Sequence, residues 1–214
     1  MTENKEFNEL LKEFGSTPEG IKNNQISRKE SDQVTVSLPV FKYSFPQVIT
    51  KKTCKEYRES FPQSNTSNVK AWHSDYLTHE TTDVFDPLIN IVISACNTIT
   101  SEYYHTNLIN GYHFIVNNLW LAMYDKNEYT RRHDHFLSLF SACYYVDVKD
   151  NSSPITFIGE NDEMNIQPEN GMLLIWHGSI PHMVAPTKKK RTCICMNIMV
   201  SHNHILRGSK YLSK

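Results

Sequence analysis

The sequence predicts a mainly β fold in which helices pack on one side of an antiparallel β-sandwich or barrel. Two observations lead to this prediction. Helical patterns dominate the first half of the chain, and after Gly111 the apolar residues alternate with a period of two, as strands require. Because helices come first and a run of strands follows, the helices are expected to cover one face of the strands.

The N-terminal part of the chain is expected to stand apart from the main domain. Residues 6–14 place apolar side chains at helical spacing, and the polar stretch that follows, up to Gln33, is typical of a linker or an irregular surface segment. We therefore predict a helix and polar segment over residues 1–33, and one main domain over residues 34–214 with its core at about 111–200.

Within the main domain, a strand over Val34–Phe45 and a short helix over Lys51–Phe61 are expected first. The clearest helix covers Asp86–Tyr104, with Asp86 as N-cap, Pro87 at the first helical position and a following apolar stripe. Further strands are then predicted, with turn signals between them, over Tyr112–Tyr124, Ser138–Val148, Ile155–Ile158, Met172–Trp176 and Arg191–Val200.

Composition limits the possible partners. Hydrophobic residues make up 39% of the 214 residues, charged residues 21%, and the formal net charge is -1. Such a balance provides no field to attract nucleic acid, and we expect no membrane partner. The first residues, Met1–Glu13, carry no signal-peptide pattern, so a cytoplasmic location is expected, which would be the host cytoplasm if a phage encodes the chain.

The five cysteines are an odd number and include no Cys-x-x-Cys pair, so a disulfide framework is not expected. Cys193 and Cys195 lie two positions apart and would share one face of a strand. They fit either a zinc-binding pair or buried free thiols that act as small hydrophobic groups, and the second interpretation is preferred.

Candidate metal ligands follow the first long strand. Residues two apart in a strand point the same way, so His133 and His135 can present two imidazoles to one metal while Asp134 points to the other face. His182, near the start of a later strand, is the best candidate for a third ligand. Alone, a His-x-His pair is more often a surface or core pair than a metal site, but three protein ligands would leave open positions on an octahedral metal.

Two strands provide polar side chains for a common lumen. Arg191 begins a strand in which Arg191, Cys193, Cys195 and Asn197 share one parity, while the other parity suits packing against helices. A buried arginine needs an anionic partner, and its fork of N–H groups suits a carboxylate. In the earlier strand, Asn118, Trp120, Ala122 and Tyr124 share a parity that suits a lumen, although core packing explains Trp120 equally well.

Taken together, these motifs resemble the Fe(II)- and 2-oxoglutarate-dependent oxygenases, in particular the prolyl-hydroxylase-like branch and a group of bacterial and phage oxygenases. The likeness covers roughly Asn117 to Asn197 and extends faintly to Ala71-Trp72-His73-Ser74. The order of the motifs carries it: Asn118-x-Trp120, His133-x-His135, Ser141-x-x-Tyr144-Tyr145, Pro168-x-x-Gly171, His182-x-Val184 and Arg191-x-Cys193 through Asn197.

The resemblance implies a double-stranded β-helix, jelly-roll or cupin-like, with helices packed on one face. It implies that His133, His135 and His182 bind Fe(II). It also implies that 2-oxoglutarate is held by Arg191 with help from Tyr124, Tyr145 and Asn118, and that Cys193 occupies a place where the related proteins have a serine. Trp120, Trp72 and His177 are candidate substrate contacts.

The implied reaction consumes dioxygen and 2-oxoglutarate, releases succinate and carbon dioxide, and by default hydroxylates an unidentified protein side chain or small molecule. His135 stands where most of the superfamily has an acid, so the ligand set would be three neutral imidazoles. The strand alternation disfavours Asp134 as a ligand unless a bulge changes the register.

Two other functions are also compatible with the sequence. A cupin-like metalloenzyme without 2-oxoglutarate would use the same histidines, but cupins usually place a glutamate shortly after the His pair, and Phe136-Leu137-Ser138-Leu139 follows here. A cupin-like site of this kind would also leave Arg191 without a ligand to bind. A non-enzymatic β-sandwich binding module would fit the eleven tyrosines and three tryptophans, and it predicts no tightly bound metal.

Overall fold

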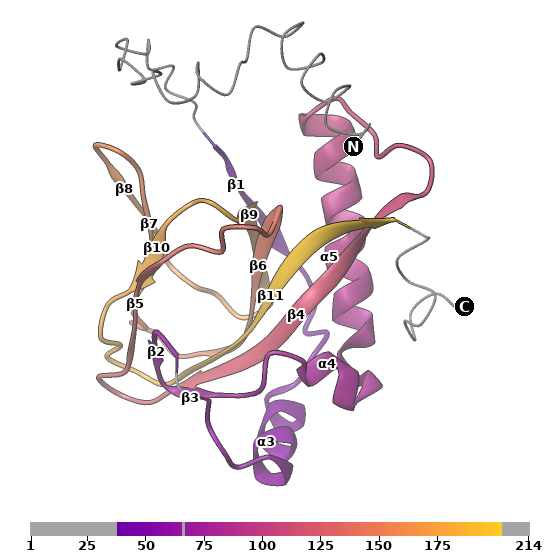
Figure 1. Ribbon diagram of the computed structural model, residues 1–214. Helices are drawn as coiled ribbons and strands as arrows, with labels where there is room; N and C mark the ends of the chain where they lie inside the picture. Colours follow the sequence, from indigo (N-terminus) through magenta and orange to yellow (C-terminus); the bar gives the residue numbers. More distant parts are fainter. Residues whose placement is uncertain (1–37, 66, 203–214) are drawn as a thin grey trace, which may run out of the picture. The chain divides into compact units, whose positions relative to one another are not determined.

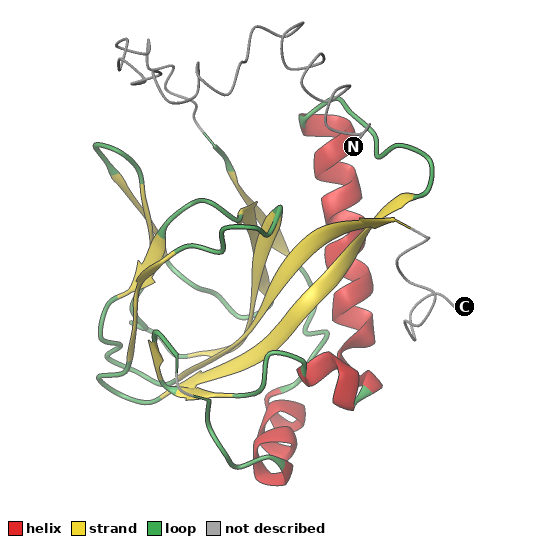
Figure 2. Cartoon of the chain, viewed as in Figure 1, coloured by secondary structure: helices red, strands yellow, loops and turns green. Residues whose placement is uncertain are grey.

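The computed structural model describes residues 38–65 and 67–202. These residues form two antiparallel β-sheets, and helices pack against the outer side of the larger sheet (Figures 1 and 2). The expected mainly β fold with helices on one side is confirmed. The helix predicted over residues 6–14 and the first residues of the strand predicted from Val34 lie outside the described residues.

The larger sheet contains the longest strands and carries most of the core. Its six strands, in spatial order, are β1 (Val40–Ser44), β9 (Met172–His177), β6 (Phe140–Val148), β11 (Arg191–His202), β4 (Tyr112–Tyr124) and β3 (Trp72–His73).

The smaller sheet lies opposite and is made of short strands. In spatial order they are β2 (Val69–Lys70), β5 (Tyr129–His133), β10 (His182–Val184), β7 (Ile155–Ile158) and β8 (Glu163–Ile166). Strand β8 was not predicted, because it is only four residues long and its residues are exposed or half-buried.

Helices precede the long strands. They are α3 (Lys51–Ser60), α4 (Thr78–Thr81), the 3₁₀ turn η1 (Asp83–Phe85), α5 (Asp86–Thr98) and the π-helical turn η2 (Ile99–Tyr103). Helix α3 begins where predicted, and the Thr50 hydroxyl accepts the Thr53 backbone N–H at 3.1 Å as its N-cap. The assignment of Asp86 as N-cap was wrong by one residue, because η1 leads directly into α5 and Phe85 takes that position.

Helix α5 belongs to a long apolar helical run. The run Asp83–Tyr103 has a mean hydropathy of 1.2 and is long enough to cross a membrane by length and composition alone. Its side chains Leu88, Val92 and Cys96 are fully buried in a cluster with residues of the larger sheet. Packing in the core of the fold therefore accounts for its apolar character.

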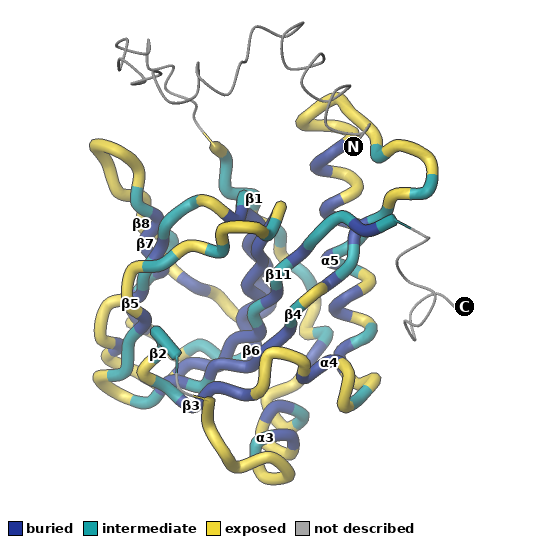
Figure 3. Tube along the Cα trace, in the orientation of Figure 1, coloured by how far each residue is buried: buried dark blue, intermediate teal, exposed yellow. Residues whose placement is uncertain are grey.

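Most residues of the central strands β6 and β9 are buried (Figure 3), and strand alternation divides the larger sheet into two faces. Leu121 of β4 and Ile194 of β11 pair across the sheet and are fully buried in the cluster on the helical side. The opposite face, between the sheets, carries a second cluster that includes Tyr145, Trp176 and Cys193. The predicted parity of β11 is thus confirmed, and its polar set faces the space between the sheets.

Replacement of Ile194 by alanine should destabilise the fold by about 2–5 kcal/mol, because the side chain is fully buried and its loss leaves a cavity. Equilibrium unfolding in urea measures the change. Ile109→Ala is the matched control, since Ile109 is 77% exposed and should change stability by less than about 0.5 kcal/mol. Equal losses in both variants would contradict this assignment of the core.

Candidate metal centre and anion site

Three histidines from the smaller sheet and the loop that follows β5 converge between the sheets. Each of His133, His135 and His182 offers one ring nitrogen, and these three nitrogens lie within 4.8 Å of one another. The ring centroids are 4.9 Å apart for His133 and His135, 4.3 Å for His133 and His182, and 5.1 Å for His135 and His182. One metal ion could therefore contact all three rings.

Pairing of β5 with β10 brings two of these rings together. His133 is the last residue of β5, His182 is the first of β10, and the two are direct partners in the antiparallel register. Side chains directly opposite each other in such a pair lie on the same face, a few ångströms apart. Residues distant in the sequence thus become neighbours through backbone pairing.

His135 reaches the site by a different route from the one predicted. The expectation that His133 and His135 share one strand was wrong, because β5 ends at His133. The His135 backbone N–H instead donates to the Gly178 carbonyl at 2.7 Å, and the Gly178 N–H donates to the Leu139 carbonyl at 3.1 Å. The loop after β9 therefore holds the segment that carries His135.

Hydrogen bonds orient two of the rings for metal binding. The Nδ1 atom of His133 lies 2.9 Å from the Arg131 carbonyl, and that of His182 lies 3.1 Å from the Ile180 carbonyl. A carbonyl can only accept, so Nδ1 carries the proton in both rings and donates it. The lone pair is then on Nε2, which leaves Nε2 as the metal-binding atom.

The three rings are neutral at neutral pH. Burial, with a further contribution from the neighbouring imidazoles, lowers the pKa of His135 and of His182 to about 3. Burial also lowers the pKa of His133. Neutral imidazole is the form that binds a metal ion, so no proton has to leave before an ion binds.

Asp134 does not join the ligand group. Its carboxylate accepts the Phe136 backbone N–H at 3.0 Å, and the residue is exposed. The nitrogen ligands that converge are those of His133, His135 and His182. The side chain between the two histidines thus stabilises the turn after β5.

Arg191 lies between the sheets, in the same cavity as the three histidines. It is only 2% exposed, and its Nη1 donates to the Ser153 carbonyl at 3.0 Å. Its Nε is buried without a hydrogen-bond partner, and no ion pair among residues 38–65 and 67–202 involves it. A buried cation with free donors and no counter-charge is the arrangement expected for an anion site.

Two tyrosines flank the guanidinium group of Arg191. Its central carbon lies 4.6 Å from the ring centre of Tyr124 and 5.7 Å from that of Tyr145. The Tyr124 hydroxyl is 2.6 Å from the Thr130 hydroxyl, whereas the buried Tyr145 hydroxyl has no hydrogen-bond partner among the described residues. Burial raises the pKa of Tyr145, so its hydroxyl keeps its proton and is available as a donor.

The other residues expected in the lumen lie on the same face of β4, β6 and β11. Asn118 accepts a hydrogen bond from Asn197 at 3.4 Å, and Ser141 donates to Asn197 at 3.3 Å. Trp120 lies further along β4, with its ring 5.7 Å from His135, and it lines the cavity. Cys193 also lines the cavity, and its thiol is 3.8 Å from the Ala122 carbonyl.

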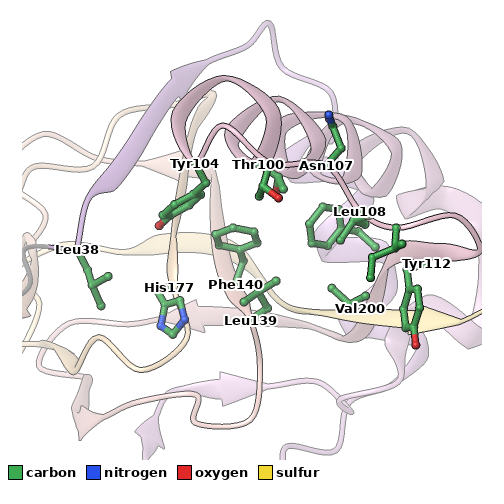
Figure 4. Close-up of a pocket in the computed structure, with 13 residues that line it drawn as sticks. Leu38, Thr100, Tyr104, Asn107, Leu108, Tyr112, Leu139, Phe140, His177 and Val200 are labelled. Carbon is green, nitrogen blue, oxygen red and sulfur yellow. The ribbon is translucent and has the colours of Figure 1, made fainter.

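Two of the candidate substrate residues lie elsewhere. Trp72 is buried in the cluster on the helical side, where its Nε1 donates to the Pro62 carbonyl at 3.2 Å. His177 lines a separate apolar groove of about 700 Å³ beside the end of η2 (Figure 4). The structure thus groups neither residue with the histidines.

Some residues of the cavity were not identified from the sequence. The ring centroids of Trp176 and His182 are 4.9 Å apart, and the Nε1 atom of Trp176 is buried without a hydrogen-bond partner among the described residues. Thr130 and Cys143 also line the cavity. Alternation along Met172–Trp176 places Trp176 on one face with Leu174, but only the pairing of β9 with β6 shows that this face is the inner one.

Gly178 should be essential for the position of His135. A Cβ atom at this residue would lie 2.2 Å from the Ser138 carbonyl oxygen and 2.9 Å from the His135 carbonyl oxygen, and backbone cannot move away cheaply. Gly178→Ala should therefore weaken metal binding by about 10–100-fold, a loss typical of residues that orient ligands.

Isothermal titration with Fe(II) under anaerobic conditions measures this loss. Gly159→Ala is the control, because the nearest atom to its added Cβ belongs to the Asp162 side chain, on a turn between β7 and β8. An unchanged metal affinity in Gly178→Ala would show that the loop after β9 does not position His135.

Comparisons with known proteins point to the fold. No protein-family model and no curated protein matches the sequence. Among solved structures, a prolyl-4-hydroxylase of Pseudomonas putida matches with a TM-score of 0.57 at 16% identity, over 75% of this chain and 91% of that one.

Two further structures match over similar lengths. The non-haem α-ketoglutarate-dependent epimerase SnoN from nogalamycin biosynthesis has a TM-score of 0.55 at 12% identity, over 81% of this chain and 83% of its own. A Trichoplax adhaerens prolyl hydroxylase in complex with a hypoxia inducible factor peptide fragment has a TM-score of 0.51 at 15% identity, over 82% and 87%. At these identities the likeness establishes the fold: the chain is a double-stranded β-helix with helices on one face, as expected from the sequence motifs.

Proposed function

We propose that the chain is an Fe(II)- and 2-oxoglutarate-dependent dioxygenase that hydroxylates a protein side chain or a small molecule and releases succinate and carbon dioxide. The observation that carries the proposal is the shared cavity. Three neutral imidazoles and a buried arginine without a counter-charge line the same space between the sheets.

The residues present fit an iron(II) ion. His133 and His182 have their Nε2 atoms free, and His135 completes a set of three nitrogen donors, which suits a first-row transition metal and leaves positions for other ligands. A bound iron(II) ion would supply the redox chemistry that activates dioxygen, while the protein orients the reactants and excludes water.

The charges of the site favour an anionic co-substrate. Three neutral imidazoles leave the positive charge of a divalent ion uncompensated, and Arg191 adds another buried positive charge. A dicarboxylate compensates both at once, with one carboxylate near the metal and the other at Arg191. The unpaired Arg191 Nε and the protonated Tyr145 hydroxyl are the donors that would hold the far carboxylate.

The size of the cavity bears on the substrate. Its volume is about 40 Å³, well below the roughly 300–1,000 Å³ of sites that enclose a drug-sized ligand. A bulky substrate would therefore remain at the mouth and present only the reacting group to the metal. A side chain that projects from a polypeptide fits this requirement, and a prolyl hydroxylase with a similar fold is known in complex with a peptide.

The proposal is tested by anaerobic titration of the iron(II)-loaded protein with 2-oxoglutarate. Chelation should produce a weak visible charge-transfer band. Arg191→Ala should weaken oxoacid binding by at least about 30-fold, because loss of one partner of a buried charge pair costs roughly 2 kcal/mol or more. Arg132→Ala is the control, since Arg132 is exposed and next to the ligand His133.

Far-UV circular dichroism confirms that Arg191→Ala is folded before the titration. A folded variant that binds 2-oxoglutarate as tightly as the parent protein would refute the assigned role of Arg191. If the parent protein binds zinc or manganese tightly at the three histidines and never consumes 2-oxoglutarate in a succinate-release assay with a panel of peptides and small molecules, the cupin-like alternative is correct instead.

A further inference from the structure

A second group of metal-ligand atoms lies in the cavity beside the histidines. Cys143 of β6 and Cys193 and Cys195 of β11 place their three sulfur atoms within 4.8 Å of one another. Together with the histidines, they are the two groups of convergent ligands found within residues 38–65 and 67–202. Of these two groups, only the histidines serve as metal ligands in the function proposed above.

Sheet pairing assembles this cysteine cluster. Cys195 is the direct partner of Cys143 across β11 and β6, and Cys193 lies two positions along β11, on the same face. The sulfur of Cys195 is 4.0 Å from that of Cys193 and 3.9 Å from that of Cys143. Three thiols from two strands thus surround one point.

These distances match the dimensions of a metal–thiolate site. A zinc–sulfur bond of about 2.3 Å separates the sulfur atoms by roughly 3.8 Å in a tetrahedral site and by roughly 4.0 Å in a trigonal one. The two measured separations fall in this range without any movement of the strands. Two of the three sulfur pairs are therefore already at the spacing that a shared metal ion requires.

Charge favours a divalent ion at this point. Three buried thiolates are costly unless cations compensate them. Arg191 lines the same cavity, and when no dicarboxylate is bound there, one positive charge on Arg191 with two on the metal would balance three thiolates.

The environment also suits a soft ion. Thiolate ligands select zinc and other thiophilic metals over magnesium or calcium. Cys195 lines the cavity and is only partly buried, so an ion can reach the sulfur atoms from the cavity. Buried thiols that merely fill space need no such convergence of sulfur atoms.

We propose that Cys143, Cys193 and Cys195 form a binding site for a divalent thiophilic ion of the zinc class, distinct from the histidine site. The proposal rests on the sulfur positions, their burial and the nearby guanidinium, and it does not require the proposed oxygenase activity. Because Arg191 also serves the proposed oxoacid site, the ion and the dicarboxylate would compete for the same cavity. The ion's remaining coordination position would be open to a small ligand in the cavity.

The test is an anaerobic titration of the reduced full-length protein with Cd(II), followed by ultraviolet absorbance. Thiolate-to-cadmium charge transfer reports sulfur ligation specifically, so binding at the histidines does not contribute to the band. We expect one equivalent of Cd(II) to produce the band. Added Zn(II) should remove the band, because it displaces Cd(II) from the same sulfur ligands. Absence of the band would overturn the proposal.

Variants separate the cysteine site from other thiols. Cys195→Ser should weaken Cd(II) binding by at least about 100-fold, because loss of a ligand exceeds the 10–100-fold cost of losing a residue that merely orients one. Cys96→Ala is the control, since Cys96 is fully buried in the cluster on the helical side. His182→Ala should keep the band, because that residue belongs to the other site.

Folding is checked for each variant by circular dichroism, and Cys143→Ala provides a second test if Cys195→Ser does not fold. A folded Cys195→Ser or Cys143→Ala that binds Cd(II) as tightly as the parent protein would overturn the proposal. Loss of the band in Cys96→Ala or in His182→Ala would also contradict it.

Discussion

Pairing of His133 with His182 across β5 and β10 is the contact on which the site depends. These residues are far apart in the sequence, and only the antiparallel register of two short strands places their rings 4.3 Å apart. Each ring is then oriented by a carbonyl of its own strand or of the turn before it, and His135 is added by the loop that contains Gly178. The larger sheet contributes a different part, because β11 brings Arg191 to the same cavity from the opposite side.

Because the two sheets supply different side chains to the cavity, one fold can bind a cation and an anion together. The smaller sheet supplies neutral nitrogen donors, whose burial keeps them unprotonated. The larger sheet supplies a buried guanidinium group between two aromatic rings, and its Nε donor has no acceptor among the described residues. A ligand that carries two negative groups is the natural bridge between the sheets. The cysteine cluster shows that the same inner face also offers soft ligands, a few strand positions from the arginine.

The inward-facing side chains could be predicted from the sequence where apolar alternation continues over a long strand. In β4 and β11 the parity of Trp120, Tyr124 and Arg191 was enough to predict which side chains face the lumen, because each strand keeps its alternation over many residues. The prediction from sequence failed where a side chain's position depends on which strands or loops pair with its own segment. His135 lies beyond the end of β5, and the contributions of Trp176 and Cys143 follow from the order of strands in the sheet, which no local pattern encodes. Trp72 has the right residue type, but the strand β3 turns it toward the helices.

Three imidazoles, and not sulfur, are expected to bind iron in this cavity. X-ray absorption spectroscopy of the iron(II)-loaded protein, with and without 2-oxoglutarate, distinguishes these two kinds of ligand. We expect the multiple-scattering pattern of three imidazole ligands in both samples, and additional oxygen scattering when the oxoacid is present. Iron bound through sulfur at about 2.3 Å, or without imidazole scattering, would contradict it.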